Sequence, residues 1–204
     1  MKPIDISIAY PIRDSLYLNM TNRCTLACTF CPKFIDYTVK GYVLKLNKEP
    51  TVEEVMMAIG NPTSYREIVF CGFGEPTQRL TDLLEITRRL KKQYPESKIR
   101  LNTDGLGNLV YGRNIIPELA KGIDAVSVSL NAADAPTYAK YCRSKYREKA
   151  YEAVKDFIRE AKKYIREVTA TVVGLPDIDR QACRKLVEEE LGVRFRYREY
   201  NQVG

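Results

Sequence analysis

The chain has 204 residues, of which 45% are hydrophobic and 29% charged, and its formal net charge is +7. This balance predicts one globular domain, residues 1–204, with a buried core. Because Cys71, Cys142 and Cys183 are scattered singly, no additional cysteine-rich cluster domain is expected. No apolar run is long enough to span a membrane and the N-terminus lacks a signal-peptide pattern, so we expect a cytoplasmic protein with reduced thiols. The positive charge favours an anionic partner; a basic solvated surface is the alternative, because much of the charge lies in helical runs.

Short β-rich runs alternate with longer amphipathic segments along the chain. The expected strands are residues 16–20, 67–71, 98–102, 125–130, 168–173 and 193–200. A helix opens at residue 51, where Thr51 and Glu54 form a capping-box pattern. Further helices are expected at residues 81–92, 114–120, 137–142, 147–164 and 179–191. This α/β alternation predicts a parallel sheet with right-handed crossovers. Six units are fewer than the eight of a closed TIM barrel, so we expect an open, partial (β/α)6 TIM-like barrel, with a doubly wound sheet as the alternative.

The least ordinary residues come directly after the expected strands. Three cysteines follow the first strand, Gly-Phe-Gly-Glu-Pro follows the second, and Asn-Thr-Asp-Gly follows the third. Ser129 and Asn131 lie at the end of the fourth strand, and Gly174 lies at the end of the fifth. The carboxyl ends of parallel barrel strands meet at one rim, where active sites lie. The positions therefore favour the partial barrel.

Cys24, Cys28 and Cys31 are separated by three and then two residues. Three thiols this close either react together or hold a ligand, and three ligands on a four-iron, four-sulfur cluster leave one iron open for chemistry. A zinc site is an alternative. Since the chain has no histidine, a fourth zinc ligand would be a carboxylate or one of the other cysteines, Cys71, Cys142 and Cys183. A disulfide with a spare thiol is a further alternative, but nothing marks the chain as secreted.

The second motif is the run of residues 72–76. Gly72 and Gly74 would let the backbone approach a ligand closely, and Glu75 would add a carboxylate facing a cationic group. Pro76 ends the strand. A tight turn at the end of a strand is the alternative, because glycine and proline commonly mark turns.

Together the two motifs resemble those of the radical S-adenosylmethionine (radical SAM) enzymes. The loop Cys-x-x-x-Cys-x-aromatic-Cys, with Phe30 as the aromatic residue, resembles the loop that binds their [4Fe-4S] cluster. Residues 72–76 resemble the Gly-Gly-Glu motif that holds the methionine amino group of S-adenosylmethionine. Phe73 departs from that motif, since the family has glycine or a smaller residue there. The resemblance covers residues 16–200.

The resemblance also implies further cofactor-binding positions. Asn102 or Thr103, and Ser129 with Asn131, match positions that bind the ribose and the methionine carboxylate. Short polar residues at strand ends are also common turn formers. Phe30 would lie beside the adenine, with a plain core aromatic as the alternative. The apolar strand end at residues 171–174 resembles the family's adenine-binding edge.

The activity that the resemblance implies is radical chemistry. S-adenosylmethionine would bind the open iron, and an electron from a flavodoxin- or ferredoxin-like donor would lead to its reductive cleavage. The resulting 5′-deoxyadenosyl radical would abstract a hydrogen atom from a substrate that the sequence does not identify, while the protein orients that substrate.

A narrower resemblance rests on residues 17–24, 101–108 and 198–201. These segments resemble the short radical SAM proteins associated with TatD-family metal-dependent hydrolases, which implies such a hydrolase as a partner. Two other functions stay open. One is a non-catalytic iron–sulfur or zinc protein that regulates a partner hydrolase, and the other is a glycyl-radical activase.

The remaining candidates are a thiol and a basic strand. Cys142 is placed to reach the cavity as a hydrogen-atom donor or nucleophile, whereas Cys71 and Cys183 are expected to be packing residues. The last strand alternates arginines with other residues, which places Arg194, Arg196 and Arg198 on one face. If that face lines the barrel, Arg198 could bind the phosphate or carboxylate of an anionic substrate. If it faces outward, the arginines protect the sheet edge against aggregation.

Overall fold

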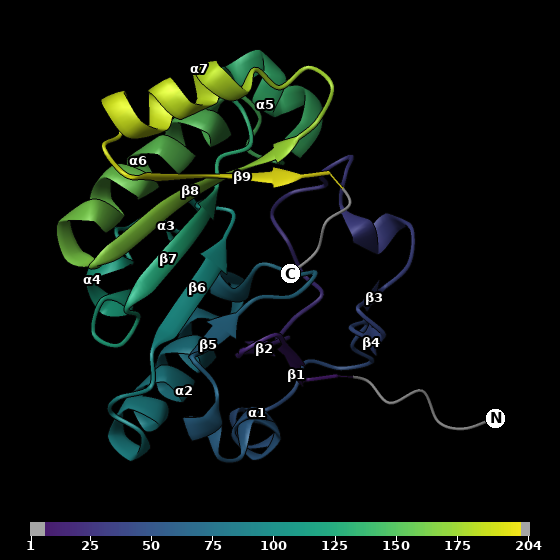
Figure 1. Cartoon of the computed structure of the whole chain (residues 1–204), viewed down its shortest axis with the longest axis vertical. Coiled ribbons are helices and arrows are strands. Elements are labelled where there is room, and N and C mark those ends of the chain that lie inside the picture. The colour runs from purple at the N-terminus through teal and green to yellow at the C-terminus, as the bar shows by residue number, and fades with distance from the viewer. Residues whose placement is uncertain (1–6, 201–204) are drawn as a thin grey trace.

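Seven strands form one curved sheet in the order β1-β2-β5-β6-β7-β8-β9 (Figure 1). The computed structural model describes residues 7–200. The strands are β1 (Ala9–Ile12), β2 (Ser15–Leu18), β5 (Glu67–Phe70), β6 (Ile99–Thr103), β7 (Ala125–Ser129), β8 (Glu167–Gly174) and β9 (Arg194–Glu199). All neighbouring pairs are parallel except β1 with β2. Within residues 7–200, β1 and β9 are the free edges of the sheet, so the fold is an open α/β barrel as predicted.

Each of the six predicted strands is present, with ends shifted by one or two residues. The antiparallel edge strand β1 was not predicted, because four residues containing Pro11 give little strand signal. Proline is tolerated only where no ladder hydrogen bond is needed, which an edge position allows. The short hairpin of β3 (Thr38–Val39) and β4 (Tyr42–Val43) was also missed, since two-residue strands show no periodicity.

Helices cover the convex face of the sheet (Figure 1). They are α1 (Val52–Ile59), α2 (Leu80–Gln93), α3 (Gly107–Tyr111), α4 (Ile116–Leu119), α5 (Ala135–Cys142), α6 (Lys149–Tyr164) and α7 (Arg180–Lys185). The capping box is confirmed, because Glu54 N–H donates to Thr51 Oγ1 (3.1 Å) and Thr51 N–H donates to the Glu54 carboxylate (2.8 Å). The predicted helix at 179–191 divides into α7 and a π-helical turn, η4 (Leu186–Glu190). The short α3 was not predicted. In the described part of the chain, no helix is long and apolar enough to cross a membrane.

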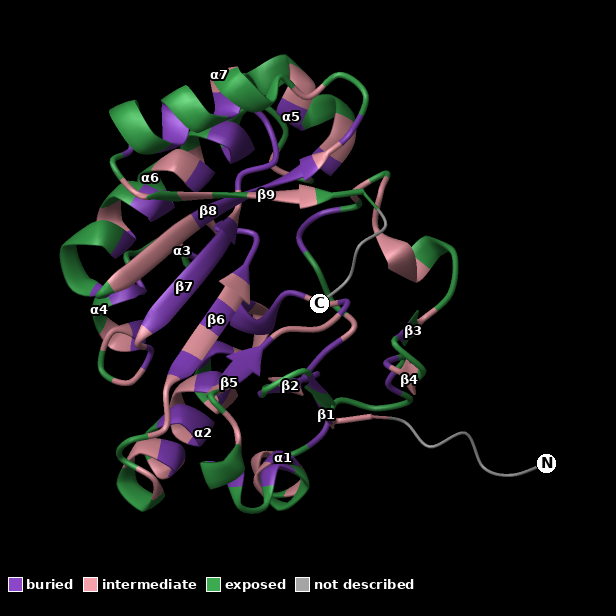
Figure 2. Ribbon diagram, viewed as in Figure 1, coloured by how far each residue is buried: buried purple, intermediate pink, exposed green. Residues whose placement is uncertain are grey.

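The main core lies between the helices and the sheet, where the buried segments in Figure 2 meet. Helix α6 contributes Val154, Phe157, Ile158 and Ala161, spaced so that all four lie on one helical face. The strands that oppose this face contribute residues such as Leu101, which is fully buried. This packing fixes the helix-facing side of every central strand.

The opposite, concave face of the sheet is polar. In β6, buried Ile99 and Leu101 alternate with half-buried Arg100 and Asn102, and successive side chains point to opposite faces of a strand. The concave side therefore carries hydroxyl, amide and guanidinium groups on its central strands. A TIM barrel normally fills this space with branched apolar side chains. A polar interior leaves room for a ligand instead.

Candidate functional site

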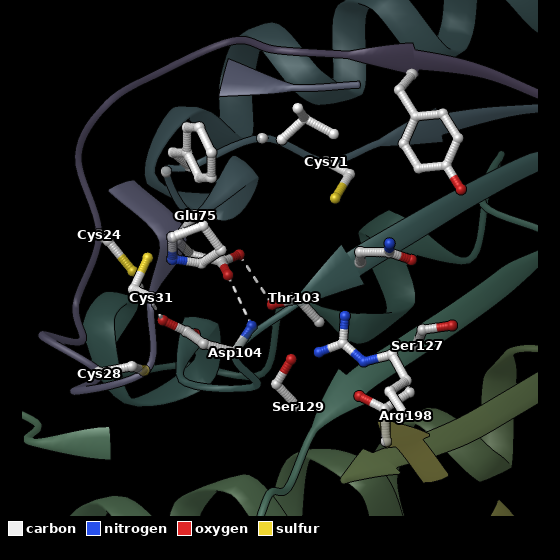
Figure 3. A pocket seen from close by; sticks show the side chains of 18 of the residues that line it. Cys24, Cys28, Cys31, Cys71, Glu75, Thr103, Asp104, Ser127, Ser129 and Arg198 are labelled. Atoms are coloured by element: carbon white, nitrogen blue, oxygen red, sulfur yellow. Dashed lines mark hydrogen bonds between the residues drawn. The ribbon is translucent and has the colours of Figure 1, made fainter. Parts of the chain in front are cut away.

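A cavity of about 520 Å³ lies on the concave face, at the carboxyl ends of the parallel strands. Thirteen of the residues predicted to bind metal, cofactor or substrate line it, and Figure 3 shows several of them. They are Cys24, Cys28, Phe30, Cys31, Gly72, Phe73, Gly74, Glu75, Asn102, Thr103, Ser129, Asn131 and Arg198. Cys142, the candidate hydrogen-atom donor, and Gly174, in the expected adenine-binding edge, do not line the cavity.

The three cysteines of the loop after β2 lie along one wall of the cavity (Figure 3). All three are free thiols. Burial raises the pKa of Cys24 and of Cys31, and contact with Cys142 together with burial raises the pKa of Cys28. Since a thiol binds metal as the thiolate, loading this wall with metal would release protons.

The cysteine loop is fastened to two other segments of the chain. The hydroxyl of Thr25 donates a short hydrogen bond to the carboxylate of Asp104, which follows β6. The N–H of Thr29 donates to the carbonyl of Tyr141 at the end of α5 (2.9 Å). Asp104 is 6% exposed and was not predicted as a site residue. Asp104 could have been predicted from the sequence, because it is a carboxylate in the Asn-Thr-Asp-Gly run that directly follows a strand.

The glycines of residues 72–76 serve packing between loops. A Cβ on Gly74 would collide with the carbonyl oxygen of Thr21 and would lie 2.7 Å from that of Arg23. A Cβ on Gly72 would lie 2.5 Å from Oδ1 of Asn19. The N–H of Glu75 also donates to the carbonyl of Arg23 (2.7 Å). The missing side chains therefore let the loop after β5 support the cysteine loop. Both glycines also line the cavity, so the predicted approach of a ligand to this backbone stays a prediction.

The sequence suggested that Glu75 offers a carboxylate to a cationic group. In the structure both carboxylate oxygens accept hydrogen bonds from the protein. Its Oε1 accepts from the Thr77 N–H (3.0 Å), the Thr77 hydroxyl (2.7 Å) and the Thr103 hydroxyl (2.8 Å). Its Oε2 accepts from the Asp104 N–H (2.7 Å). Burial, with the charge of Asp104 adding to it, raises the pKa of Glu75 to about 8. The carboxyl group thus joins the loops after β5 and β6 beneath the cavity.

Asn131 presents an unsatisfied polar atom beside the cavity. Its backbone is left-handed (φ 62°) and its side chain is buried, 2% exposed. The amide Nδ2 donates to Sγ of Cys142 (3.6 Å), while Oδ1 has no hydrogen-bond partner among the described residues. A buried acceptor without a donor is costly, so a ligand donor at this position would stabilise the site.

Cys142 was expected to reach the cavity and Cys71 to pack in the core, and the structure shows the reverse. Cys142 is fully buried behind Asn131, because it lies one helical turn from buried Tyr138 on the core face of α5. Cys71 lines the cavity instead of packing in the core. Strand alternation could have found this, since Phe70 faces the helices and the next side chain must face the concave side. Cys183 is buried in the core, as expected.

Some of the remaining predicted positions line the cavity and others do not. Phe73 is buried with the ring of Tyr37 edge-on at 5.6 Å, which explains how a bulky residue fits in the glycine-rich run. Gly174 does not line the cavity, because the hydroxyl of Tyr197 occupies the space that a side chain at this position would need. On β9, Arg196 and Arg198 line the cavity and Arg194 does not.

These residues fit the cofactors that the sequence suggested. Three free thiols on one wall have the number and chemistry of ligands that an iron–sulfur cluster with one open iron needs. Among the described residues, no three ligating side chains gather around a point that could hold a single metal ion. The orphaned Oδ1 of Asn131 on the same cavity suits an ammonium or hydroxyl donor of a second ligand.

Comparison with known proteins identifies the same superfamily that the sequence motifs resemble. The family model described as the radical SAM superfamily matches residues 18–189. A GTP 3′,8-cyclase from Paenarthrobacter nicotinovorans is 28% identical over 139 residues, which is 67% of this chain and 37% of that protein. The chain spans about a third to a half of the length of the curated relatives it matches.

Solved structures share the fold. A radical SAM methyltransferase from Sphaerobacter thermophilus superposes with a TM-score of 0.63 at 18% identity, covering 95% of this chain and 58% of that chain. SuiB of Streptococcus suis, bound to the precursor peptide SuiA, superposes with a TM-score of 0.67 at 15% identity, covering 95% of this chain and 40% of that chain.

Proposed function

The chain belongs to the radical SAM superfamily, and from that premise we propose that it is an enzyme that generates a 5′-deoxyadenosyl radical to abstract a hydrogen atom from a small substrate. One observation carries the proposal. The three spaced cysteines lie on one wall of a single cavity, which is also lined by residues from each of the polar motifs predicted to bind S-adenosylmethionine.

In this family a [4Fe-4S] cluster and S-adenosylmethionine together supply the reductive cleavage that yields the radical. In this chain, Cys24, Cys28 and Cys31 would hold the cluster as thiolates. The Oδ1 of Asn131 would accept a hydrogen bond from the second cofactor, and Phe30 would give it an apolar wall. Asp104 and Glu75 would keep the two supporting loops in place.

The test is anaerobic reconstitution with iron and sulfide, followed by incubation with S-adenosylmethionine and dithionite. We expect 5′-deoxyadenosine to form, with an iron–sulfur absorption band in the visible. Cys28→Ala should lose both the band and the product, because it removes a ligand. The control Cys183→Ala, in the core away from the cavity, should keep both. A protein that binds zinc in place of iron, or a loaded cluster without cleavage, would contradict the proposal.

We propose in addition that the chain is one of the short radical SAM proteins associated with TatD-family hydrolases, with such a hydrolase as partner and a flavodoxin- or ferredoxin-like electron donor. This assignment rests on the segments named in the sequence analysis. A second candidate comes from the relatives named GTP 3′,8-cyclase, which suggests a nucleotide substrate. Incubating the reconstituted protein with GTP would distinguish the candidates, since only the nucleotide enzyme would consume it.

A further inference from the structure

Strand β9 divides its three arginines between two environments. Arg196 pairs in register with Thr171 of β8, and Arg198 pairs with Val173, at the end of the sheet that carries the cavity. Both arginines line the cavity, Arg196 from an exposed position and Arg198 from a half-buried one, whereas Arg194 is exposed and outside it. The arginine face of β9 therefore faces solvent at one end and the cavity at the other, so each of the two predicted readings holds for part of the strand.

Arg198 is a half-buried cation without a counter-ion among the described residues. Its Nε is inaccessible to solvent and has no hydrogen-bond partner in the described part of the chain. Among residues 7–200, no carboxylate forms an ion pair with it. Burial lowers the pKa of Arg198, which reflects the cost of keeping the charge away from water. Such a cost is normally offset by a partner.

Arg100, which also lines the cavity, is paired with a carboxylate, as a partly buried arginine usually is. It pairs with Glu67 at 2.7 Å and donates to Oδ1 of Asn102 at 2.8 Å, so its donors are occupied. The buried carboxylates of the cavity are also engaged, since Glu75 and Asp104 accept hydrogen bonds within the protein. No described carboxylate, including that of Glu199, which also lines the cavity, lies within ion-pair distance of Arg198.

Polar groups surround the guanidinium of Arg198. Figure 3 shows it directed into the cavity beside Ser127, with Ser129 and Thr103 nearby and the three cysteines at the other end of the view. A guanidinium presents a planar set of donors that matches the oxygens of a carboxylate or phosphate, and serine hydroxyls can add donors to the same oxygens.

We propose that Arg198, with Arg196 and Ser127, forms a subsite for an oxyanion of the substrate, either a carboxylate or a phosphate. The description of the ligand as the substrate rests on the proposed function; the anion site itself rests on the geometry. The substrate would then be an anionic small molecule, held by its charged group away from the cysteines while its reacting carbon faces the cofactors.

The test measures anion binding by titration calorimetry of the anaerobically reconstituted protein, with inorganic phosphate and succinate as probes and no reductant. At least one probe should bind, and Arg198→Ala should weaken it at least about tenfold, because a charge-assisted hydrogen bond is lost. Arg198→Lys should retain part of the binding, since the charge remains. The matched control Arg194→Ala removes the same charge from the same strand outside the cavity, and should bind as the parent protein does.

Several outcomes would overturn the subsite. One is that neither probe binds. Another is that Arg194→Ala weakens probe binding as much as Arg198→Ala does. A third is that Arg198→Ala and Arg198→Lys, both folded by circular dichroism, bind the probe as the parent protein does. Repeating the titration with saturating S-adenosylmethionine identifies the source of the anion. Unchanged probe binding supports a substrate, whereas displacement would assign Arg198 to the cofactor's own carboxylate. Because no cleavage is required, failure of the radical activity would leave this result intact.

Discussion

At the scale of single residues, the unusual feature is a pair of buried carboxyl groups, Glu75 and Asp104. Both lie beneath the cavity and join the loops that support the cysteines. Burial raises the pKa of each, because the charged form is poorly solvated. The chain has no histidine, so no side chain with an ordinary pKa titrates between pH 5 and 8. A stability change in that range would report on this pair.

The prediction concerns the pH dependence of unfolding of the metal-free protein. The pKa of Glu75 rises from 4.5 to about 8 on folding, so the folded state holds the proton more tightly than the unfolded state. The free energy of unfolding should therefore fall as pH rises through this window, by about 1.4 kcal/mol per pH unit where the group titrates. Urea unfolding at intervals across the window measures it.

Glu75→Gln should remove much of this slope, because the residue no longer titrates. The matched control Glu188→Gln, at an exposed position, should keep the slope of the parent protein. A slope that survives in Glu75→Gln would mean that Glu75 does not carry the pH dependence.

At the scale of elements, the site depends on how closely two loops approach. The loop after β5 has no side chain at Gly74, where the backbone carbonyls of Thr21 and Arg23 occupy the space. At Gly72 the obstacle is a side-chain atom, Oδ1 of Asn19, which has no hydrogen-bond partner among the described residues. The two glycines thus differ in how much a methyl group would disturb the cysteine loop.

Gly74→Ala should destabilise the protein by about 3 kcal/mol or more and lower the iron retained after reconstitution, because backbone cannot easily give way. Gly72→Ala should cost less, on the order of 1 kcal/mol, with iron content near that of the parent. Urea unfolding and iron analysis of the two variants make the comparison. If both glycines tolerate alanine equally, the close approach of the loops is not what positions the cysteines.

At the scale of the whole molecule, helices cover one face of an open sheet (Figure 2). The cavity, which has both polar and apolar lining residues, lies on the other face. The main apolar core lies between the helices and the sheet, whereas the cavity on the concave face is space that a ligand can fill. Binding to the folded state alone raises the free energy of unfolding in proportion to the logarithm of ligand concentration.

S-adenosylmethionine should therefore stabilise the cluster-loaded protein, by about 2.7 kcal/mol at one hundred times its dissociation constant. Anaerobic thermal unfolding measures the shift. The metal-free protein and Cys28→Ala should show a much smaller shift, because the cofactor would lose its contact with the open iron. Equal stabilisation of loaded and metal-free protein would place the cofactor away from the cysteines.

Local patterns in the sequence were sufficient for the six parallel strands and for the gathering of most predicted site residues around one cavity. The six parallel strands, the capping box at Thr51 and the cysteine spacing each depend on neighbours within a few positions. Parallel strands place their carboxyl ends together whatever the details of packing, so residues that follow different strands could be predicted to meet. The cavity lined by those residues agrees with this reasoning.

The tertiary structure alone decided the roles within the site. Whether Glu75 faces a ligand or its neighbours depends on Thr103 and Asp104, which follow another strand. Whether Arg198 faces solvent or the cavity depends on the curvature of the whole sheet, since the alternation of β9 defines two faces without saying which is enclosed. The sequence determines which side chains share a face or a rim through short-range geometry. Their partners, burial and charge balance come from segments distant in the chain, which only folding brings together.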